Sequence, residues 1–458
     1  MPLDPATLHD LDVLSTSTPR GPTLVSLVDR TRSRAGREAL RLRLVVPSDS
    51  AEDILALQRA HQSLAADAAG YRAIFDRIDS DGAERYLSSN WQLPSARPAL
   101  TRFVEGLWRP RWFRDYLREI GSGQFRIVSL LRAAGDLSSK LSATNAAILK
   151  ELGASLAVLL ASREAQVLLD LGARKSTSGQ LAFDQLARDA AKPLLLEIIR
   201  HLGTVEAMWS FGVATAEHGW SYPRPAAQLR AVGLFHPFLG RGAVANDLHL
   251  DHQTRVCFVT GPNMAGKSTF LKAIGIAVLL AHAGCGVPAA SMEFPIVRTI
   301  FSSVQIVDNL SAGESFYLAE VRRIRSLAVA LRDHRSAVAV LDEPFRGTNV
   351  HDAAEATLAV ISRLVSHPAA LVFVASHLAE IVPSIVDDPR VCLLHFSADI
   401  SAEQPVFDYK LRRGLSTQRL GMTLLKQEGV LELLEPSSGN SDAPVLRASE
   451  APATRSVT

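Results

Sequence analysis

The stretch at residues 259–275, VTGPNMAGKSTFLKAIG, constrains the fold of this chain more than any other. Gly261, Gly266, Lys267 and Ser268 fit the spacing G-x4-G-K-[ST]. In such a loop the glycines let backbone N–H groups approach a phosphate, the lysine neutralises its charge, and the hydroxyl ligates Mg²⁺. A strand must lead into the loop and a helix must follow, with its N-terminus aimed at the anion. The pattern therefore predicts an α/β sheet with a phosphate-binding loop at its edge.

Two further strand ends carry residues suited to phosphate chemistry. The run SAVAVLDEP places Asp342 and Glu343 after an apolar strand, where we expect Asp342 to bind Mg²⁺ and Glu343 to polarise an attacking water. The run LVFVASH ends at His377, on the sheet edge where ligands bind, and we expect this residue to contact the γ-phosphate or hold the water. Surface acids and a structural histidine are the alternative interpretation, which the upstream phosphate loop disfavours. Adjacent acids also indicate hydrolysis rather than a nucleotide switch.

Hydrophobic periodicity divides the chain into parts. Residues 1–230 repeat apolar positions every three and four residues, which predicts an all-helical region with long helices, interrupted near Pro193. From about residue 231 to 435, short apolar runs alternate with helical patterns, which predicts a mostly parallel sheet with covering helices. Residues 436–458 are small and polar, so we expect a disordered tail.

Composition limits the class of protein. The chain has 458 residues, 47% hydrophobic and 21% charged, which is typical of a globular protein with a large core. A net charge of +2 does not indicate a nucleic-acid binder, so any basic surface must be local. Three cysteines without a CxxC pair argue against a disulfide framework or a structural zinc site. No signal-peptide pattern is present, and the apolar run at 273–290 directly continues the phosphate loop, so we expect a buried helix and a cytoplasmic protein.

The insert Pro262-Asn263-Met264 within the loop resembles the P-loop of the MutS family of DNA mismatch-repair ATPases. The segments DNLSAGESFYLAE, LDEPFRGTN and ASHLAE resemble the family's other ATPase motifs, in the family's order. The resemblance covers about residues 8–432 and extends from the start of a helical lever domain to the end of the ATPase domain. It implies an all-helical lever domain followed by a P-loop (ABC-type) α/β ATPase domain, with ATP and Mg²⁺ bound at sites that two subunits complete.

The resemblance also implies roles for individual residues. Catalysis would depend on Glu343, His377 and Lys267, and Mg²⁺ would bind Ser268 and Asp342. The residues expected to bind ATP are Gly261, Pro262, Asn263, Met264, Ala265, Gly266, Lys267, Ser268 and Thr269 in the loop, with Asn246 and His395. The signature residues expected to reach the nucleotide of the other subunit are Ser311, Gly313 and Ser315. The family has an aromatic residue near the adenine three positions before the residue that matches Asn246, and this chain has Ala243 there.

The chain also departs from the family pattern. It begins at the lever domain, so we expect neither the N-terminal mismatch reader with its Phe-x-Glu wedge nor the connector. The clamp that encloses DNA is expected to be absent or very short. After Val430 we expect no room for the helix-turn-helix that dimerises many members.

One basic and aromatic stretch, at residues 103–120, is a candidate for DNA contact. Its Arg109, Arg111 and Arg114 alternate with Trp108 and Trp112, a combination that suits phosphates and stacked bases. The other interpretation, which the periodicity favours, is an amphipathic helix with aromatic side chains inward and arginines outward.

The predicted function is that of a MutS-family, ATP-dependent DNA-binding protein that acts as a homodimer or a MutS-like heterodimer, with other repair proteins as possible partners and no membrane. Two alternatives stay open. One is a paralogue that acts on branched or recombining DNA without reading mismatches, and the other is a nucleotide-regulated scaffold with little turnover. A transporter subunit is disfavoured, because the Leu-Ser-Gly-Gly-Gln signature does not occur.

Overall fold

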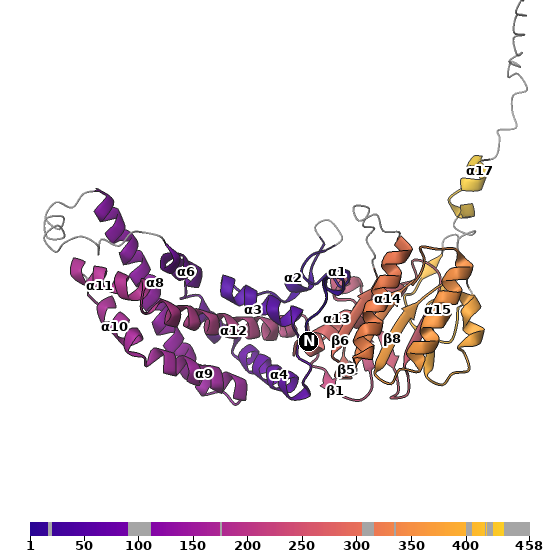
Figure 1. Cartoon of the computed structure of the whole chain (residues 1–458), viewed down its shortest axis with the longest axis horizontal. Coiled ribbons are helices and arrows are strands. Elements are labelled where there is room, and N and C mark those ends of the chain that lie inside the picture. The colour runs from indigo at the N-terminus through magenta and orange to yellow at the C-terminus, as the bar shows by residue number, and fades with distance from the viewer. Residues whose placement is uncertain are drawn as a thin grey trace, which may run out of the picture.

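A computed structural model describes residues 1–16, 21–89, 111–174, 176–304, 316–333, 336–399, 405–416, 418 and 425–434. Within these ranges, helices account for the regular structure up to Glu217, and the first strand begins at Arg224. Figure 1 shows an elongated molecule with the helical part at one end and the sheets at the other. The predicted fold class, a helical region followed by an α/β region, is confirmed.

Most helices of the helical part begin with a side-chain cap. Ser33, Ser50, Ser162 and Ser176 each accept a hydrogen bond from the backbone N–H three residues later, which satisfies a donor that the helix itself leaves unpaired. The helices are α1 (Pro5–Asp10), α2 (Leu24–Val28), α3 (Arg34–Val45), α4 (Ala51–Ala66), α5 (Ala68–Phe75), α6 (Ser80–Ser88), α8 (Arg111–Ser142), α9 (Ala147–Leu160), α10 (Arg163–Gly172), α11 (Thr177–Arg188) and α12 (Lys192–Glu217).

Helix α12 is the central element of the helical part, and α3, α4 and α9 pack along it. Pro193 stands in its first turn, where the missing N–H would have no partner in any case. The interruption expected near Pro193 is therefore the gap between α11 and α12, and α12 itself is continuous.

Two glycines set the closest approaches to α12. A Cβ added at Gly203 would lie 2.6 Å from the carbonyl carbon of Ala35, next to α3. A Cβ added at Gly212 would lie 2.2 Å from the carbonyl oxygen of His61 on α4. Backbone atoms cannot give way as a flexible side chain can, so these two positions require glycine.

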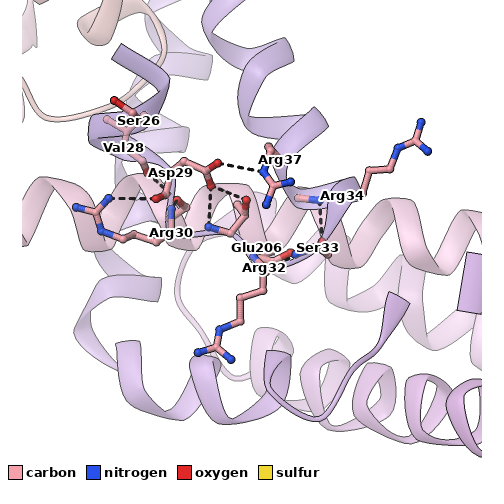
Figure 2. A network of polar contacts seen from close by, with 12 residues as sticks. Ser26, Val28, Asp29, Arg30, Arg32, Ser33, Arg34, Arg37 and Glu206 are labelled. Atoms are coloured by element: carbon pink, nitrogen blue, oxygen red, sulfur yellow. Dashed lines mark hydrogen bonds and ion pairs between the residues drawn. The ribbon is translucent and has the colours of Figure 1, made fainter. Parts of the chain in front are cut away.

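A polar network joins the start of α3 to α12 (Figure 2). The buried Glu206 accepts hydrogen bonds from the backbone N–H of Arg32, at 2.7 Å, and from the hydroxyl of Ser33. Burial raises the pKa of Glu206, and these donors oppose that rise by favouring the carboxylate. Nearby, the Ser210 hydroxyl donates to the carbonyl of Val28 at 2.7 Å. The network fixes how the first helices enter the helical part.

The main sheet has the strand order β12-β9-β4-β8-β7-β6 within the described residues. Neighbouring strands run parallel except β12 and β9. Its strands are β4 (Val256–Thr260), β6 (Thr299–Ser303), β7 (Ala337–Asp342), β8 (Ala370–Ala375), β9 (Val391–His395) and β12 (Arg412–Arg413). Because the strands are parallel, the C-terminal ends of β4, β7 and β8 meet at one edge. The predicted phosphate loop and carboxylates follow these strands.

Smaller elements flank this sheet. A second sheet has the order β1-β5-β2-β3, and β10 pairs with β11. The remaining elements are β1 (Arg224–Pro225), β2 (Arg230–Leu234), β3 (Asn246–His249), β5 (Ser291–Phe294), β10 (Ala398–Asp399), β11 (Val406–Phe407), α13 (Lys267–His282), α14 (Phe316–Arg332), α15 (Val350–Val365), α17 (Val430–Leu434) and the 3-10 turns η2 (Pro237–Gly242) and η4 (Ala379–Ser384).

Helix α13 lies inside the largest hydrophobic core. Every residue from Ala273 to His282 is buried, and the same core contains Leu11, Phe211 and Phe373 from the N-terminal segment, α12 and the main sheet. Residues 273–289 of the apolar run are thus covered by protein, as expected, and α13 accounts for the part up to His282. Among the described residues no single helix is both long and apolar enough to cross a membrane; α9 and α10 reach that measure only as a pair bent by 67°.

The N-terminal segment is tied to the sheet by polar contacts as well. Asp4 pairs with Arg323 of α14 at 2.7 Å, and the backbone N–H of Ser302 donates to the hydroxyl of Thr7 at 3.0 Å. The buried Asp10 accepts from the Ser302 hydroxyl at 3.0 Å. Residues far apart in the sequence therefore hold the end of β6 and the first half of α14.

The close approach of α4 to α12 leads to a stability prediction. Gly212→Ala should lower the free energy of unfolding by about 1–3 kcal/mol, because the new methyl group collides with backbone. Gly135→Ala on α8 is the matched control, since a Cβ there meets nothing within 4 Å. That change should raise stability by about 0.5–1 kcal/mol through helix propensity. Urea unfolding of both variants measures the difference, and equal midpoints would contradict the packing argument.

Candidate functional site

The loop between β4 and α13 adopts a conformation that depends on glycine. Gly261 and Gly266 have φ angles of 139° and 103°, and Met264, which lies between them, has a φ of 68°. A Cβ at Gly261 would lie 2.6 Å from the carbonyl oxygen of Phe396, the residue that follows strand β9. Helix α13 begins at Lys267 without a side-chain cap, so its first N–H groups remain available for an anion.

Lys267 lies buried under the loop, with 5% of its surface exposed. Its ammonium donates to the carbonyls of Gly261 and Pro262 at 2.8 and 3.1 Å. Burial lowers the pKa of Lys267, while the charges of Glu343 and Asp342 raise it again. A buried cation with carboxylates nearby is suited to receive the negative charge of a phosphate.

Asp342 ends β7 and faces the start of α13. Burial raises the pKa of Asp342, and a hydrogen bond with Ser268 lowers it. Its Oδ1 is buried and has no hydrogen-bond partner among the described residues. A buried acceptor left unpaired in this way is costly and indicates that another group satisfies it.

Glu343 follows in a strained backbone conformation, with a φ of 46°. Its backbone N–H donates to the carbonyl of Ala375 at 2.8 Å, which extends the pairing of β7 with β8 by one residue. Its carboxylate lies 3.5 Å from Nδ1 of His377, so the predicted base and the predicted histidine are neighbours. His377 is the more exposed of the two, with 57% of its side chain accessible against 25% for Glu343.

These groups surround a cavity of about 690 Å³. Of the predicted site residues, those that line it are Asn246, Asn263, Met264, Gly266, Lys267, Ser268, Thr269, Asp342 and Glu343. His377 borders a smaller hollow of about 80 Å³, which shares Glu343 and Arg346 with the large cavity. The loop residues Gly261, Pro262 and Ala265 lie behind the cavity wall in the turn itself.

Asn246 acts on the cavity through backbone contacts. Its amide donates to the carbonyl of Tyr409 at 3.0 Å, and its oxygen accepts from the N–H of Leu411 at 2.7 Å. Tyr409 has a φ of 54° and lines the cavity, close enough to Gly266 that a Cβ there would lie 3.3 Å from the tyrosine ring. Asn246 therefore holds an aromatic ring in place at the cavity mouth.

His395 does not line the cavity, whereas its neighbour Phe396 does. His395 is on β9, paired with Thr260, and adjacent residues of an extended strand face opposite sides. Tyr409 and Phe396 are thus cavity residues that the sequence interpretation did not select, whereas Arg346, which also lines the cavity, stands in the motif LDEPFRGTN. Tyr409 stood in the segment FDYKLRRG, but nothing local marked it as a partner of the loop.

The remaining predicted residues either lie away from this cavity or are not among the residues that the structure describes. Ser311, Gly313, Ser315 and Arg109 lie outside the described residues. Arg111 and Arg114 are exposed at the start of α8, at the far end of the helical part (Figure 1). Phe113, Tyr116 and Ile120 of the same helix are buried together, which is the arrangement expected of the amphipathic-helix interpretation.

Comparisons with known proteins identify the sheet region. Residues 257–434 match the family model of MutS domain V. The chain is 32% identical over 239 residues to "DNA mismatch repair protein MutS 2" of Halobacterium salinarum, a match that covers 51% of this chain and 28% of that protein. It is 30% identical over 239 residues to "DNA mismatch repair protein MutS" of Chlorobium phaeovibrioides, covering 50% of this chain and 27% of that protein.

These matches confirm the resemblance to MutS proteins. The matched region is an ABC-type ATPase domain and thus an ATP-binding one. The chain spans less than a third of the length of the curated relatives it matches.

The wall made by Tyr409 can be tested by nucleotide binding. Tyr409→Ala should weaken ATP binding about 2- to 10-fold, the loss expected when an aromatic contact of roughly 0.5–1.5 kcal/mol is removed. Tyr409→Phe retains the ring and should bind as the wild type does. Asn246→Ala should weaken binding in the same direction, because it releases the tyrosine backbone. Calorimetric titration with ATP checks the order; unchanged affinity in Tyr409→Ala would show that the ring does not contact the nucleotide.

Proposed function

We propose that this chain, whose residues 257–434 match MutS domain V, hydrolyses MgATP and uses the nucleotide cycle to control how it holds DNA. The observation that carries the proposal is the convergence of Lys267, Asp342 and Glu343 on one cavity at the C-terminal edge of a parallel sheet. Lys267 follows β4, and Asp342 and Glu343 lie at the end of β7. Lys267 is a cation suited to bind an anion, Asp342 has a buried carboxylate oxygen, and the Glu343 side chain is 25% exposed. Such a set suits phosphoryl transfer to water.

The residues present fit a magnesium ion. The unpaired buried Oδ1 of Asp342 and the adjacent Ser268 hydroxyl are hard oxygen donors, which Mg²⁺ prefers. No group of three or more His, Cys, Asp or Glu side chains in the described ranges could hold a metal, and Mg²⁺ in phosphate sites takes most of its ligands from phosphate and water. Ser268 and Asp342 would hold the ion, which when bound neutralises charge on the phosphate oxygens.

The chain's own residues then divide the work. Lys267 and the N–H groups at the start of α13 bind and orient the phosphates. Glu343 accepts a proton from the attacking water, and His377, 3.5 Å from that carboxylate, keeps it oriented and contacts the terminal phosphate. Tyr409 and Phe396, which line the same cavity, offer aromatic surface to the base of the nucleotide.

The larger assembly follows from the resemblance. Residues 1–230 would form a lever domain and residues 231–435 the ATPase domain, with 436–458 as a tail. Two subunits, identical or MutS-like, would complete each other's sites through Ser311, Gly313 and Ser315. DNA is the proposed partner, because the relatives are named as DNA mismatch repair proteins. Arg111 and Arg114 remain candidate contacts with its phosphates.

Hydrolysis is tested by removing the proposed base. Glu343→Gln should lower the rate of phosphate release at least about 100-fold, the contribution expected of a general base, and leave ATP binding intact. Glu355→Gln on the exposed face of α15 removes the same charge outside the cavity and should match the wild type. If wild type and Glu343→Gln release phosphate at equal rates, the proposal that the chain is an enzyme is wrong. The alternative of a nucleotide-regulated scaffold with little turnover would then be favoured.

The DNA substrate is tested with a panel. Homoduplex, single-mismatch duplex and four-way junction are titrated with and without ATP at two stated salt concentrations, because phosphate contacts make affinity salt-dependent. We expect ATP to change the affinity for at least one of them. Tighter binding to the mismatch supports a mismatch-repair role, tighter binding to the junction supports a paralogue that acts on branched DNA, and no binding to any of them contradicts the DNA proposal.

A further inference from the structure

The loop that follows Glu343 is held in an unfavourable backbone conformation. Both Glu343 and Phe345 have positive φ angles, 46° and 65°, which residues with side chains rarely adopt. Such a conformation persists only where surrounding groups impose it. Because this loop carries Glu343 and also Arg346, which lines the cavity, whatever imposes the conformation also sets the position of both side chains.

Glu320 of α14 is placed to impose it. Its side chain is 3% exposed, and its Oε2 accepts a hydrogen bond from the N–H of Gly347 at 3.2 Å. The backbone N–H groups of Phe345 and Arg346 are near enough to the same carboxylate to favour its charged form. Burial raises the pKa of Glu320, and these three N–H groups and the Arg346 charge lower it. One buried carboxylate thus holds the turn after Glu343 by a hydrogen bond at Gly347, with the neighbouring N–H groups and the Arg346 charge favouring its ionised form.

The first residues of α14 pack against the same turn. A Cβ at Gly347 would lie 2.6 Å from the ring of Phe316 and 2.9 Å from the backbone nitrogen of Tyr317. The Arg346 guanidinium lies over the Phe316 ring at 5.1 Å, and the Tyr317 and Phe345 rings are 6.0 Å apart. The turn therefore fits onto α14 at a contact that only glycine allows.

We propose that Glu320 is a positioning residue for hydrolysis, which holds the 345–347 turn on α14 and so fixes Glu343 and Arg346 at the cavity. The proposal rests on the proposed ATPase function and assigns α14 a part in it. Glu320 is absent from the cavity lining, so it acts through the turn and not on the nucleotide. Its carboxylate is suited to this because two oxygens can accept several N–H donors at once.

The test separates turnover from binding. Glu320→Gln and Glu320→Ala should lower kcat for ATP hydrolysis by about 10- to 100-fold, the size of effect expected from a small misplacement of a reacting group. The Kd for ATP should stay within about 2-fold of wild type, because the phosphate loop is untouched. Glu320→Gln keeps one acceptor oxygen and should be the milder of the two. Glu355→Gln is again the matched control for loss of a carboxylate.

A double-variant cycle distinguishes positioning from a general loss of stability. In the Glu343→Gln background, Glu320→Gln should cause no further loss of kcat, because Glu343, the reacting group of the two that it positions, is already gone. Gly347→Ala keeps Glu320 but pushes the turn away from Phe316 and Tyr317, and should reproduce the loss of kcat at unchanged Kd.

Each outcome decides between the proposals. If wild type hydrolyses ATP and Glu343→Gln does not, but Glu320→Gln and Gly347→Ala both turn over normally, the positioning role is wrong and the ATPase stands. Additive losses in the double variant, or a parallel loss of ATP affinity, would also overturn it. If wild type and Glu343→Gln turn over equally, the proposed function itself fails.

Discussion

The burial of α13 on every side is the constraint on which the rest of the structure depends. The helix must present its first turn to the cavity, since the phosphate loop leads directly into it. All its residues from Ala273 to His282 are buried, so the N-terminal segment, α12 and the main sheet pack on one helix and share one core. Truncating a buried side chain there would cost about 2–5 kcal/mol, which ties the position of the loop to the packing of both parts of the chain.

Helix α14 gives a second connection between the cavity and the helical part. Glu320 faces the turn after Glu343, and Arg323, one turn further along, pairs with Asp4 and lies 3.9 Å from the centre of the Phe301 ring. The N-terminal segment that carries Asp4 continues through α2 into α3, which packs along α12. The turn after Glu343 is thus connected to the N-terminal segment through polar and aromatic contacts of α14.

Local patterns were enough to predict the fold class and the centre of the site. The phosphate loop and the pair Asp342-Glu343 are recognisable because their chemistry requires fixed spacing at strand ends, and the structure places them around one cavity. Tyr409 could not be selected in this way, because it reaches the cavity from a distant segment through a backbone contact with Asn246. The interpretation selected His395, but its neighbour Phe396 is the residue that lines the cavity. Neighbouring residues of a strand face opposite sides of the sheet, so an error of one position selects the wrong face. Glu320 is similar to Tyr409: nothing in its neighbourhood in the sequence indicates that its donors come from a turn beyond residue 343.

The continuity of α12 has a mechanical consequence. Its C-terminal half contributes Ala207, Phe211 and Ala214 to the core of the main sheet, while Leu195 and Ile198 belong to the core of the helical part. A helix of this length spans about 39 Å, so a tilt of roughly 10° at the sheet end displaces the other end by about 7 Å. A tilt of α12 at the sheet end would in this way be enlarged to a movement as large as the width of a side chain at its other end, without any hinge inside the helix.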